Sequence, residues 1–356
     1  MPQNKILFIL PSLVAGGAER VISYIAQNVD KNKFDPTLLV IGKEKDTSYD
    51  TNGLRIVYFE KDRVLQGIIP MFRFIRREKP KLVVTAIGHL NSAAGLIAIF
   101  FPKIKFIARE VNVLTVVKQF KKKKNPILGM VTKFSYRFID VFICQSKDMK
   151  NDFLIRNNVP ERKVKLINNP ITDGFELNRT PKKDNDILNC ITVASLKKQK
   201  GHIRILDALS KCDIPFKYTI IGNGAELDTI MDLIDSKNLK DKVTHIPFTK
   251  NVPDYLAQHD LFLQGSFVEG FPNSLLESCS VGTPVLAFNA PGGLDEIIEE
   301  GVNGFIANDE AEFIDYLKKC RDYPWDAHKI NQVVTTKFSK RKILDEYEIL
   351  FSEVIK

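Results

Sequence analysis

Short runs of β-branched and aromatic residues alternate with longer amphipathic stretches from the first residues of the chain, and this alternation constrains the fold more than any other feature. Strand-length apolar runs separated by helix-length segments are typical of a parallel sheet covered by helices. The helices expected between the strands include residues 18–29, 68–78 and 147–157. The strands expected in this first half are residues 5–10, 37–41, 54–59, 82–86, 105–108, 141–144 and 164–167.

The alternation stops at residues 168–185, which hold two prolines, a glycine and many polar residues without an apolar period. Such a composition is typical of a linker. The alternation then restarts and continues through residue 322, and residues 341–355 again have a helical pattern. The strands expected in this second half are residues 189–193, 217–221, 243–247, 261–263, 285–287 and 304–306.

The chain of 356 residues is therefore predicted to be an α/β protein with two doubly wound, Rossmann-like domains. Sheets of this kind bind ligands beyond the carboxyl ends of their strands, so we expect a cleft shared by the two domains. The expected divisions are an N-terminal domain at residues 1–168, a linker at 169–186, a C-terminal domain at 187–337 and a final helix at 338–356.

The formal net charge of +9 indicates an anionic partner. A basic composition alone does not distinguish nucleic acid, an anionic lipid surface and a phosphorylated substrate. Dense groups of positive residues lie in the N-terminal half of the chain. One group comprises Arg73, Arg76, Arg77, Lys79 and Lys81, and the other comprises Lys118, Lys121, Lys122, Lys123 and Lys124.

The cysteines and the apolar runs indicate the cellular compartment in which the chain works. Five cysteines and five histidines are scattered without a spacing typical of a disulfide or zinc framework, which favours a reducing cytosol and argues against a His and Cys metal site. The first 18 residues hold only a short apolar run, which Pro11 ends, so a signal peptide is not expected. The apolar run at residues 93–101 is too short to span a bilayer, so we expect a cytoplasmic protein, soluble or peripheral.

The first candidate for binding is the pair Gly16 and Gly17, which follows the first expected strand and opens the first expected helix. Glycines there let the backbone approach a ligand closely, and N–H groups at a helix start favour a diphosphate. A tight strand-to-helix turn requires the same residues, so position alone leaves both readings open. The segment is not a G-x-G-x-x-G motif and no acidic residue ends the second strand, which disfavours a dinucleotide site.

Two carboxylates eight residues apart, Glu269 and Glu277, form the second candidate. Asn273 is expected to cap a helix, so that Glu277 lies about one turn inside it and Glu269 lies in the preceding loop. A carboxylate accepts two hydroxyl hydrogen bonds, which suits a ribose diol for one and sugar hydroxyls for the other. A solvated loop glutamate followed by a glutamate that complements the helix dipole would have the same pattern.

The segment from Glu269 to Glu277 matches the E-x7-E motif of retaining glycosyltransferases with the GT-B fold. The chain resembles glycosyltransferase family 4, also called glycosyl transferases group 1, over nearly its whole length. Weaker matches follow the order of that family at residues 16–20, 200–201, 290–293, 296–298 and 301–305. The resemblance implies the GT-B fold, in which two Rossmann-like domains face each other across a cleft and the C-terminal helix crosses back to the N-terminal domain.

The resemblance also implies roles for individual residues. Gly16 and Gly17 would approach the donor diphosphate, and Lys200 would pair with it. Glu277 would hold the ribose, and Glu269 would contact the transferred sugar. The remaining donor-binding candidates are Ser195, Gly270, Phe271, Pro272, Asn273 and Ser274.

One departure from the family pattern concerns the diphosphate. Ser195 stands where the family commonly has an arginine that assists the lysine, and Lys197 and Lys198 are either its substitutes or simply solvated lysines. Helix N-termini and Lys200 can neutralise a leaving diphosphate, so neither a metal nor another cofactor is implied. A D-x-D at residues 184–186 lies in the expected linker and is interpreted as a solvated loop.

A second departure concerns the sugar. Glu110 stands where related enzymes often carry a histidine near the reacting sugar, which makes it a catalytic candidate beside Glu269 and Lys200. An ion pair with the preceding arginine would explain Glu110 equally well. The candidates on the acceptor or sugar side are His89, Arg109 and Asn112.

The function that the resemblance implies is a retaining, metal-independent hexosyltransferase. It would move a hexose or an N-acetylhexosamine from a nucleotide-diphosphate sugar, with UDP as the expected nucleotide, to a glycan or lipid-linked acceptor in the synthesis of cell-surface polysaccharide or glycoconjugate. A nucleotide-sugar epimerase of the same architecture would hold a similar donor but has no support from residues 269–277. A non-catalytic nucleotide or polyanion binder would explain the basic surface but not the paired carboxylates, and nucleic acid is not an expected partner.

Residues 116–138 combine the second lysine group with apolar residues at helical spacing. Basic residues beside an apolar stripe can seat a peripheral protein on anionic lipid, which would suit a lipid-diphosphate-linked acceptor. This interpretation places the protein at the inner face of the cell membrane through residues 118–124. A charged loop before an ordinary core-facing helix would have the same pattern. The apolar residues are Ile127, Leu128, Met130, Val131, Phe134 and Phe138.

Overall fold

The computed structural model describes residues 3–111, 113, 126–179 and 186–356 of the chain. These residues form two compact units. The first unit contains the described residues up to Val111 together with residues 126–170 and 340–356, and the second contains the described residues from Ile171 to Ser339 with residue 113. The chain therefore leaves the first unit after Pro170 and returns to it after Ser339.

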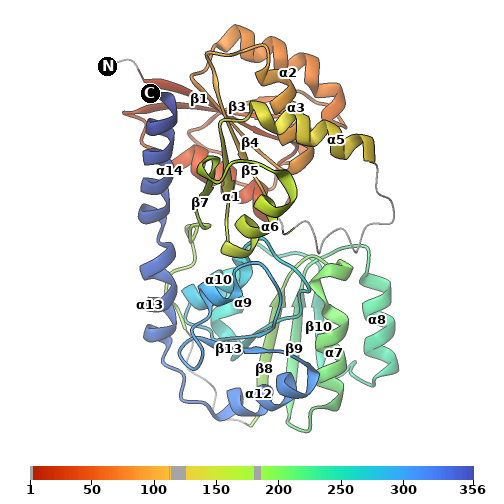
Figure 1. Cartoon of the computed structure of the whole chain (residues 1–356). Coiled ribbons are helices and arrows are strands. Elements are labelled where there is room, and N and C mark those ends of the chain that lie inside the picture. Colours follow the sequence, from red (N-terminus) through yellow and green to blue (C-terminus); the bar gives the residue numbers. More distant parts are fainter. Residues whose placement is uncertain (1–2, 112, 114–125, 180–185) are drawn as a thin grey trace. The chain divides into compact units, whose positions relative to one another are not determined.

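Among its described residues, the first unit holds a seven-stranded sheet in the order β3-β2-β1-β4-β5-β6-β7, and all of its pairings are parallel (Figure 1). The strand order reverses at β1 and β4, as it does in a doubly wound sheet. The strands are β1 (Asn4–Leu10), β2 (Phe34–Val40), β3 (Arg55–Tyr58), β4 (Leu82–Ala86), β5 (Lys105–Arg109), β6 (Val141–Cys144) and β7 (Val164–Leu166).

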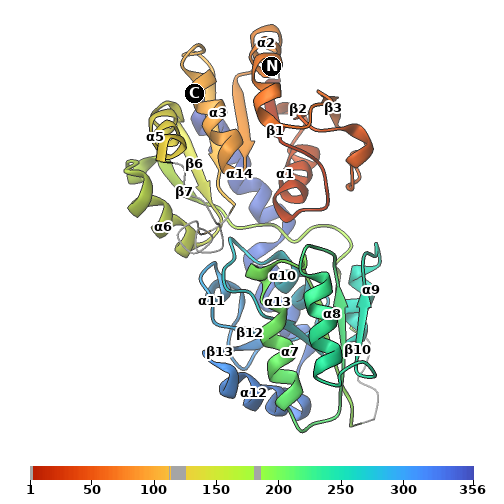
Figure 2. The same ribbon diagram turned by 90° about the vertical axis from the view of Figure 1, so that its right-hand side faces the viewer.

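Helices cover both faces of this sheet. Because successive side chains of a strand point to opposite faces, Ile6, Phe8 and Leu10 of β1 form a core with one set of helices, and α3 packs against β4 and β5 on the other face (Figure 2). The helices are α1 (Gly17–Asn28), α2 (Val64–Glu78), α3 (Gly88–Ala98), α5 (Pro126–Ser135), α6 (Lys147–Asn157) and α14 (Lys340–Ile355), with short 3-10 turns η1 (Glu44–Asp46), η3 (Tyr136–Phe138) and η4 (Glu161–Lys163).

The C-terminal helix α14 completes the core of the first unit. The ring of Phe351 meets Phe8 and Phe34 edge-on at 5.9 and 6.0 Å between centroids, and Tyr347 is fully buried beside them. Glu348 accepts a hydrogen bond from the backbone N–H of Asp30 at 2.8 Å. The expected crossing of the C-terminal helix back to the N-terminal domain is confirmed.

The second unit contains, in its described part, a six-stranded sheet in the order β10-β9-β8-β11-β12-β13, again with parallel pairings throughout. The order reverses between β8 and β11, so a loop follows each of these adjacent strands at the same edge of the sheet. Ligands bind at such a reversal in open α/β sheets. The strands are β8 (Leu188–Val193), β9 (Phe216–Ile221), β10 (Val243–Ile246), β11 (Leu261–Gln264), β12 (Val285–Phe288) and β13 (Gly304–Ala307).

The helices of the second unit divide between the two faces of its sheet (Figure 2). One apolar core joins the sheet to α7, α8 and α12, and the other joins it to α9, α10, α11 and α13. The helices are α7 (His202–Lys211), α8 (Leu227–Ser236), α9 (Val252–Gln258), α10 (Asn273–Ser280), α11 (Leu294–Ile297), α12 (Glu310–Asp322) and α13 (Ala327–Phe338), and the 3-10 turn η5 (Lys198–Lys200) precedes α7.

The predicted architecture of two parallel-sheet α/β domains is confirmed, and each expected strand overlaps an observed one. One observed helix was not among the expected elements. Helix α13 (Ala327–Phe338) begins after Asp326, whose side chain accepts hydrogen bonds from the backbone N–H groups of His328 and Lys329. Its residues Ile330 and Val334 are fully buried in the second unit, so the chain reaches the final helix through a helix and not directly from a loop.

Two kinds of feature are absent from the described residues. No helix within them has the length and apolar character needed to cross a membrane. The same residues contain no group of three or more His, Cys, Asp and Glu side chains arranged to hold a metal ion.

Candidate functional site

A lysine and a glutamate from adjacent loops of the second unit form a close ion pair. Lys200 ends η5, which follows β8, and Glu269 lies in the loop between β11 and α10. The Nζ atom of Lys200 lies 2.7 Å from Oε1 and 2.8 Å from Oε2 of Glu269. The carboxylate is largely buried, and the hydroxyl of Ser266 also donates to its Oε1 atom. Two catalytic candidates are thus brought together at the carboxyl edge of the sheet.

A glycine contact holds the two loops at this distance. Gly201 has a φ of +61°, and a Cβ atom on it would lie 1.8 Å from the carbonyl oxygen of Gly265. A Cβ on Gly265 would in turn lie 2.4 Å from the carbonyl oxygen of Gly201. Only glycine lets these backbones touch, and their contact fixes the spacing between Lys200 and the loop that carries Glu269.

Arg204, in the first turn of α7, also contacts the loop that carries Glu269. Its guanidinium donates hydrogen bonds to the carbonyl oxygens of Gly265 and Ser266. It also lies between the rings of Phe267 and Phe288, 4.2 Å from each centroid. Burial lowers the pKa of Arg204 to about 10, so the group remains a cation at neutral pH. Sequence reasoning missed this residue, although a cation in the first turn of a helix opposes the dipole and marks an unusual position.

Glu277 lies about one turn inside α10, as expected, and is 5% exposed. The expected cap is wrong, because α10 begins with Asn273 as its first helical residue and the N-cap position is Pro272. Proline has no N–H to leave unpaired and fixes its own φ, so it suits the approach to a helix without a side-chain cap.

The rest of the loop before α10 is partly structural. Gly270 and Pro272 are buried, while Asn273 and Ser274 are half-buried. The Phe271 side chain packs edge-on against Phe338 at 5.3 Å between ring centroids, inside the apolar core that includes α10 and α13. The Phe271 side chain therefore anchors the loop.

The loop at residues 290–293, which the resemblance singled out, packs on the backbone of Glu269. The N–H of Glu269 donates to the carbonyl oxygen of Pro291 at 2.9 Å. Gly292 has a φ of +126°, and a Cβ atom on it would lie 2.3 Å from the carbonyl oxygen of Glu269. The glycine is therefore required for close approach to the residue that carries the carboxylate.

Ser195 lies in the loop after β8, and its carbonyl oxygen lies 3.3 Å from Nε2 of His202. His202 is 2% exposed, and burial lowers its pKa to about 4, so the imidazole is neutral at physiological pH. The neighbouring Lys197 and Lys198 are exposed. Among the described arginines, Arg204 is the one nearest to Ser195 in the sequence, and its guanidinium contacts the loop that carries Glu269.

In the first unit, Gly16 is the N-cap residue of α1 and Gly17 is its first residue. The N–H of Gly16 donates to the hydroxyl of Tyr49 at 2.6 Å, and this hydroxyl donates to the carbonyl oxygen of Gly16 at 2.7 Å. The turn is therefore fixed by a residue that lies 33 positions further along the chain, which the local pattern could not reveal.

Glu110 lies inside the first unit, and its partners differ from those considered from the sequence. It is 2% exposed and accepts hydrogen bonds from Asn91 Nδ2 at 3.1 Å and from the Tyr136 hydroxyl at 2.8 Å. Burial raises the pKa of the Glu110 carboxyl group. Arg109 instead donates to the Tyr347 hydroxyl and to Oδ1 of Asn169.

The two described candidates for the sugar side lie at the carboxyl ends of the neighbouring strands β4 and β5 but differ in exposure. Arg109 is 1% exposed within the first unit, whereas His89 is exposed in the first turn of α3. Asn112 and the lysine group at residues 118–124 lie outside the described residues.

Comparison with known proteins gives two adjoining family matches. The family described as Glycosyltransferase Family 4 matches residues 15–174, and the family described as Glycosyl transferases group 1 matches residues 173–332. The boundary between the matches lies close to Pro170, after which the chain leaves the first unit.

Curated relatives share about a quarter of their residues with the chain. The N-acetylgalactosamine-N,N'-diacetylbacillosaminyl-diphospho-undecaprenol 4-alpha-N-acetylgalactosaminyltransferase of Campylobacter jejuni is 24% identical over 330 residues, which cover 87% of each protein. The O-antigen biosynthesis glycosyltransferase WclY of Escherichia coli is 26% identical over 245 residues, which cover 65% of this chain and 67% of WclY.

Solved structures share the fold at lower identity. Anabaena Alr3699/HepE in complex with UDP-glucose superposes with a TM-score of 0.84 at 18% identity, and the match covers 98% of this chain and 99% of HepE. The lipopolysaccharide outer core galactosyltransferase WaaB in its apo form gives a TM-score of 0.77 at 16% identity, with 98% and 99% covered.

Proposed function

The chain belongs to the family 4 glycosyltransferases with the GT-B fold, and we propose that it is a retaining, metal-independent enzyme that uses a UDP-linked hexose or N-acetylhexosamine as donor. The acceptor in this proposal is a glycan or a lipid-linked glycan of cell-surface polysaccharide synthesis. The relatives from C. jejuni and E. coli are glycosyltransferases whose names refer to a diphospho-undecaprenol acceptor and to O-antigen, and HepE was crystallised with UDP-glucose.

The ion pair between Lys200 and Glu269 is the observation that carries the proposal. An ammonium group has three N–H donors, and the two short contacts with Glu269 leave a further donor for a ligand. A donor diphosphate that approaches this edge would meet the cation, while the carboxylate would accept hydrogen bonds from sugar hydroxyls. The pair thus holds an electrostatic donor and a hydroxyl acceptor at a fixed spacing, which a nucleotide-sugar requires.

The proposed chemistry follows from where charge develops. As the bond between the sugar and the diphosphate breaks, negative charge grows on the departing oxygen, and Lys200 stabilises that charge because it is already oriented. The departing oxygen takes the proton of the acceptor hydroxyl on the same face of the sugar, and the acceptor oxygen forms the new bond there. Because the new bond forms on the face that the diphosphate leaves, the configuration at the anomeric carbon is retained. Glu269 anchors sugar hydroxyls and orients Lys200.

The proposal is tested with a panel of α-linked UDP- and GDP-sugars and acceptor glycans, incubated with and without a chelator. We expect release of free UDP and formation of an α-linked product, with activity largely unchanged by the chelator. Proton NMR of the product reports the anomeric configuration.

Four outcomes of that experiment would contradict the proposal. A β-linked product would exclude retention, and activity that a chelator abolishes and a divalent ion restores would exclude metal independence. Interconversion of donor sugars without release of nucleotide would indicate an epimerase. Binding of donor without turnover under any condition would indicate a non-catalytic nucleotide binder.

Glu277 is proposed to hold the donor ribose. We expect Glu277→Ala to weaken donor binding by about 5- to 150-fold, because a ribose diol that loses its acceptor loses about 1 to 3 kcal/mol. Isothermal calorimetry with UDP measures the change, and Glu299→Ala, at an exposed glutamate of the same unit, is the matched control. Equal affinity in the variant and the wild type, with the fold intact by circular dichroism, would remove Glu277 from the site.

The proposed acceptor places the enzyme in peripheral contact with the inner face of the cell membrane. The lysine group at residues 118–124 is proposed from the sequence to make that contact and lies outside the described residues. This part of the proposal is supported by the diphospho-undecaprenol named for the C. jejuni relative.

A further inference from the structure

Six large apolar side chains of the first unit stand exposed on α2, on α5 and just after α3, and we call this set the apolar face. Leu65 and Ile69 on α2 are 78% and 63% exposed, and Met130 and Phe134 on α5 are 72% and 47% exposed. Ile99 and Phe100, which follow α3, complete the set, with Phe100 67% exposed. Single exposed apolar side chains are ordinary, but a group on neighbouring elements marks an interaction surface.

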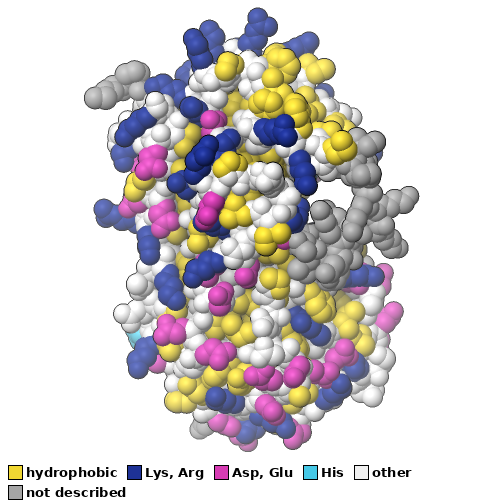
Figure 3. Space-filling view, viewed as in Figure 1, with side chains coloured by type: hydrophobic (Ala, Val, Ile, Leu, Met, Phe, Trp, Pro, Cys, Tyr) yellow, Lys and Arg dark blue, Asp and Glu magenta, His cyan; other side chains and the backbone are white. Residues whose placement is uncertain are grey.

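The elements that carry the apolar face pack against one another. Helix α3 contacts both α2 and α5. Phe72 of α2 meets Phe100 at 5.6 Å between ring centroids, and Phe134 meets Phe138 at 5.3 Å. In Figure 3, hydrophobic side chains gather over the region of α2, α3 and α5, with Lys and Arg side chains among them.

The segment of sequence that carries the apolar face is strongly basic. Residues 63–139 contain sixteen lysines and arginines and only two acidic residues, whereas the remainder of the chain is net negative. The two acidic residues are Glu78, which pairs with Arg55 and Arg77, and Glu110, which is buried. The whole positive excess of the protein therefore lies in the segment that carries the apolar face.

The apolar and basic residues also alternate along the same helices. On α2, Leu65 and Ile69 are followed at the same spacing by the exposed Arg73, and on α5 the exposed Lys133 adjoins Phe134. Residues four positions apart share one face of a helix. Each helix thus presents an apolar stripe with cations at its border, which is the pattern of a helix that lies in a membrane interface.

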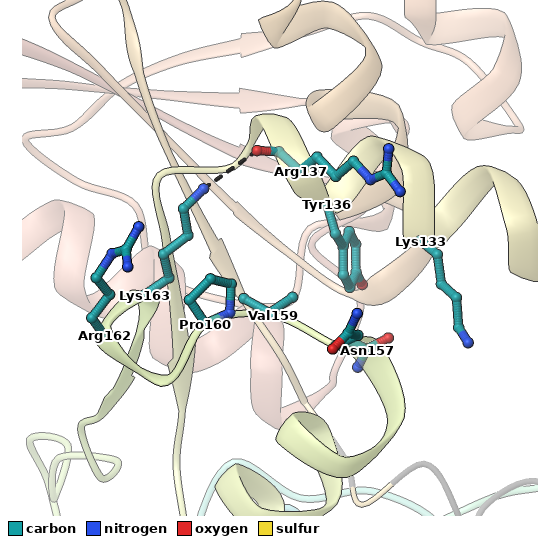
Figure 4. A pocket seen from close by; sticks show the side chains of 9 residues that line it. Lys133, Tyr136, Arg137, Asn157, Val159, Pro160, Arg162 and Lys163 are labelled. Atoms are coloured by element: carbon teal, nitrogen blue, oxygen red, sulfur yellow. Dashed lines mark hydrogen bonds between the residues drawn. The ribbon is translucent and has the colours of Figure 1, made fainter.

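A basic cavity opens beside the apolar face. Its volume is about 460 Å³, and it lies between the end of α5 and the segment that links α6 to β7 (Figure 4). Tyr136 and Asn157 lie at its inner side. Four cations and no carboxylate line it, which suits the phosphate of a lipid headgroup. The cations are Lys133, Arg137, Arg162 and Lys163.

We infer that the apolar face of α2, α3 and α5 docks on an anionic lipid bilayer, with its apolar side chains among the acyl chains and the adjoining cations, including those of the basic cavity, on lipid phosphates. The inference deepens the proposed function and rests on it for the lipid-linked acceptor. Acyl chains are the occupant that suits exposed leucine, isoleucine, methionine and phenylalanine, and anionic headgroups are the occupant that suits the excess of cations beside them.

Sedimentation with lipid vesicles tests the inference. We expect the full chain to bind vesicles of equimolar phosphatidylcholine and phosphatidylglycerol and not vesicles of phosphatidylcholine alone. The variant L65Q/I69Q/M130Q/F134Q should lose binding by about tenfold or more, because its apolar contacts are replaced by polar groups. The variant R73Q/R76Q/K133Q/R137Q should lose the preference for phosphatidylglycerol, and binding by the wild type should fall with salt.

A matched control carries the same substitution at exposed apolar residues elsewhere. M231Q/I349Q changes Met231 of α8 and Ile349 of α14, which are 39% and 60% exposed, and should bind vesicles as the wild type does. Release of UDP from donor without vesicles should be the same in all variants, because none of these residues belongs to the proposed donor site. If the proposed function is wrong, no UDP is released while vesicle binding is as expected. If the docking surface is wrong, UDP is released while vesicle binding is not as expected.

Several results would overturn the inference. One is wild-type protein that stays in the supernatant with vesicles that contain phosphatidylglycerol at low salt. Another is an apolar-face variant that sediments with these vesicles as the wild type does. Binding to heparin that equals binding to vesicles and is unchanged in the apolar-face variant would indicate a general polyanion surface. A second copy of the chain as occupant would appear as a dimer in light scattering that L65Q/I69Q/M130Q/F134Q abolishes.

Discussion

Lys200→Ala should lower the rate of sugar transfer on the order of a hundredfold or more, because the variant loses an oriented electrostatic donor to the charge that develops on the leaving diphosphate. Its ammonium is held by two contacts of 2.7 and 2.8 Å with Glu269, so little reorganisation is needed when the bond breaks. Steady-state kinetics with saturating donor measure the change in kcat, and circular dichroism checks the fold.

Lys198→Ala is the matched control, since Lys198 is exposed in the same 3-10 turn, whereas the ion pair is formed by Lys200. It should transfer sugar at nearly the wild-type rate. A Lys200→Ala enzyme within a few-fold of the wild type would remove Lys200 from the reaction. A large loss in Lys198→Ala would instead assign this lysine to the diphosphate, in place of the family arginine that Ser195 replaces.

Gly201→Ala should reduce transfer by a similar factor, of about a hundredfold, although Gly201 presents no side chain to a substrate. A Cβ atom there would lie 1.8 Å from the carbonyl oxygen of Gly265, so the loops that carry Lys200 and Glu269 must move apart. A displacement of about 1 Å among reacting groups is enough for a loss of this size. Kinetics and donor affinity should both fall while thermal unfolding remains cooperative.

Gly174→Ala separates this steric effect from backbone strain. Gly174 has a φ of +92°, and a Cβ atom on it would meet nothing within 4 Å. Its substitution should cost about 1 to 2 kcal/mol of stability through strain alone and leave transfer unchanged. If Gly201→Ala retained full activity, the glycine contact would have no part in spacing the ion pair.

The strands were predictable because each is a local apolar run bounded by turn residues. Even Phe34–Val40, which contains Pro36, was found from residue 37 onward. Helix α13 was missed because its start follows Pro324 closely, and only its packing on α10 shows which side is buried. The start of α10 was predicted one residue late, because asparagine commonly occupies the N-cap position and here Pro272 occupies it.

The candidate site was predictable only where a motif carried it. Lys200 and Glu269 were proposed from the family resemblance, and their contact joins residues 69 positions apart, which no local pattern records. Arg204, Gly265 and Tyr49 were missed because each acts through a contact with a distant loop. Glu110 shows that a neighbour in the sequence need not be a partner in the structure. It accepts hydrogen bonds from Asn91 and Tyr136, which come from other elements, and the adjacent arginine has other partners.

The core of the first unit includes α14, which is synthesised after the whole second unit. Phe8 and Phe34 leave the ribosome long before Phe351, whose ring packs against both of them. Residues 171–339 are complete before α14 has been synthesised. Domains generally fold in the order in which they are translated, yet here the unit that begins first cannot complete its core until residues 340–356 have been synthesised, and one apolar face of its sheet stays uncovered until then.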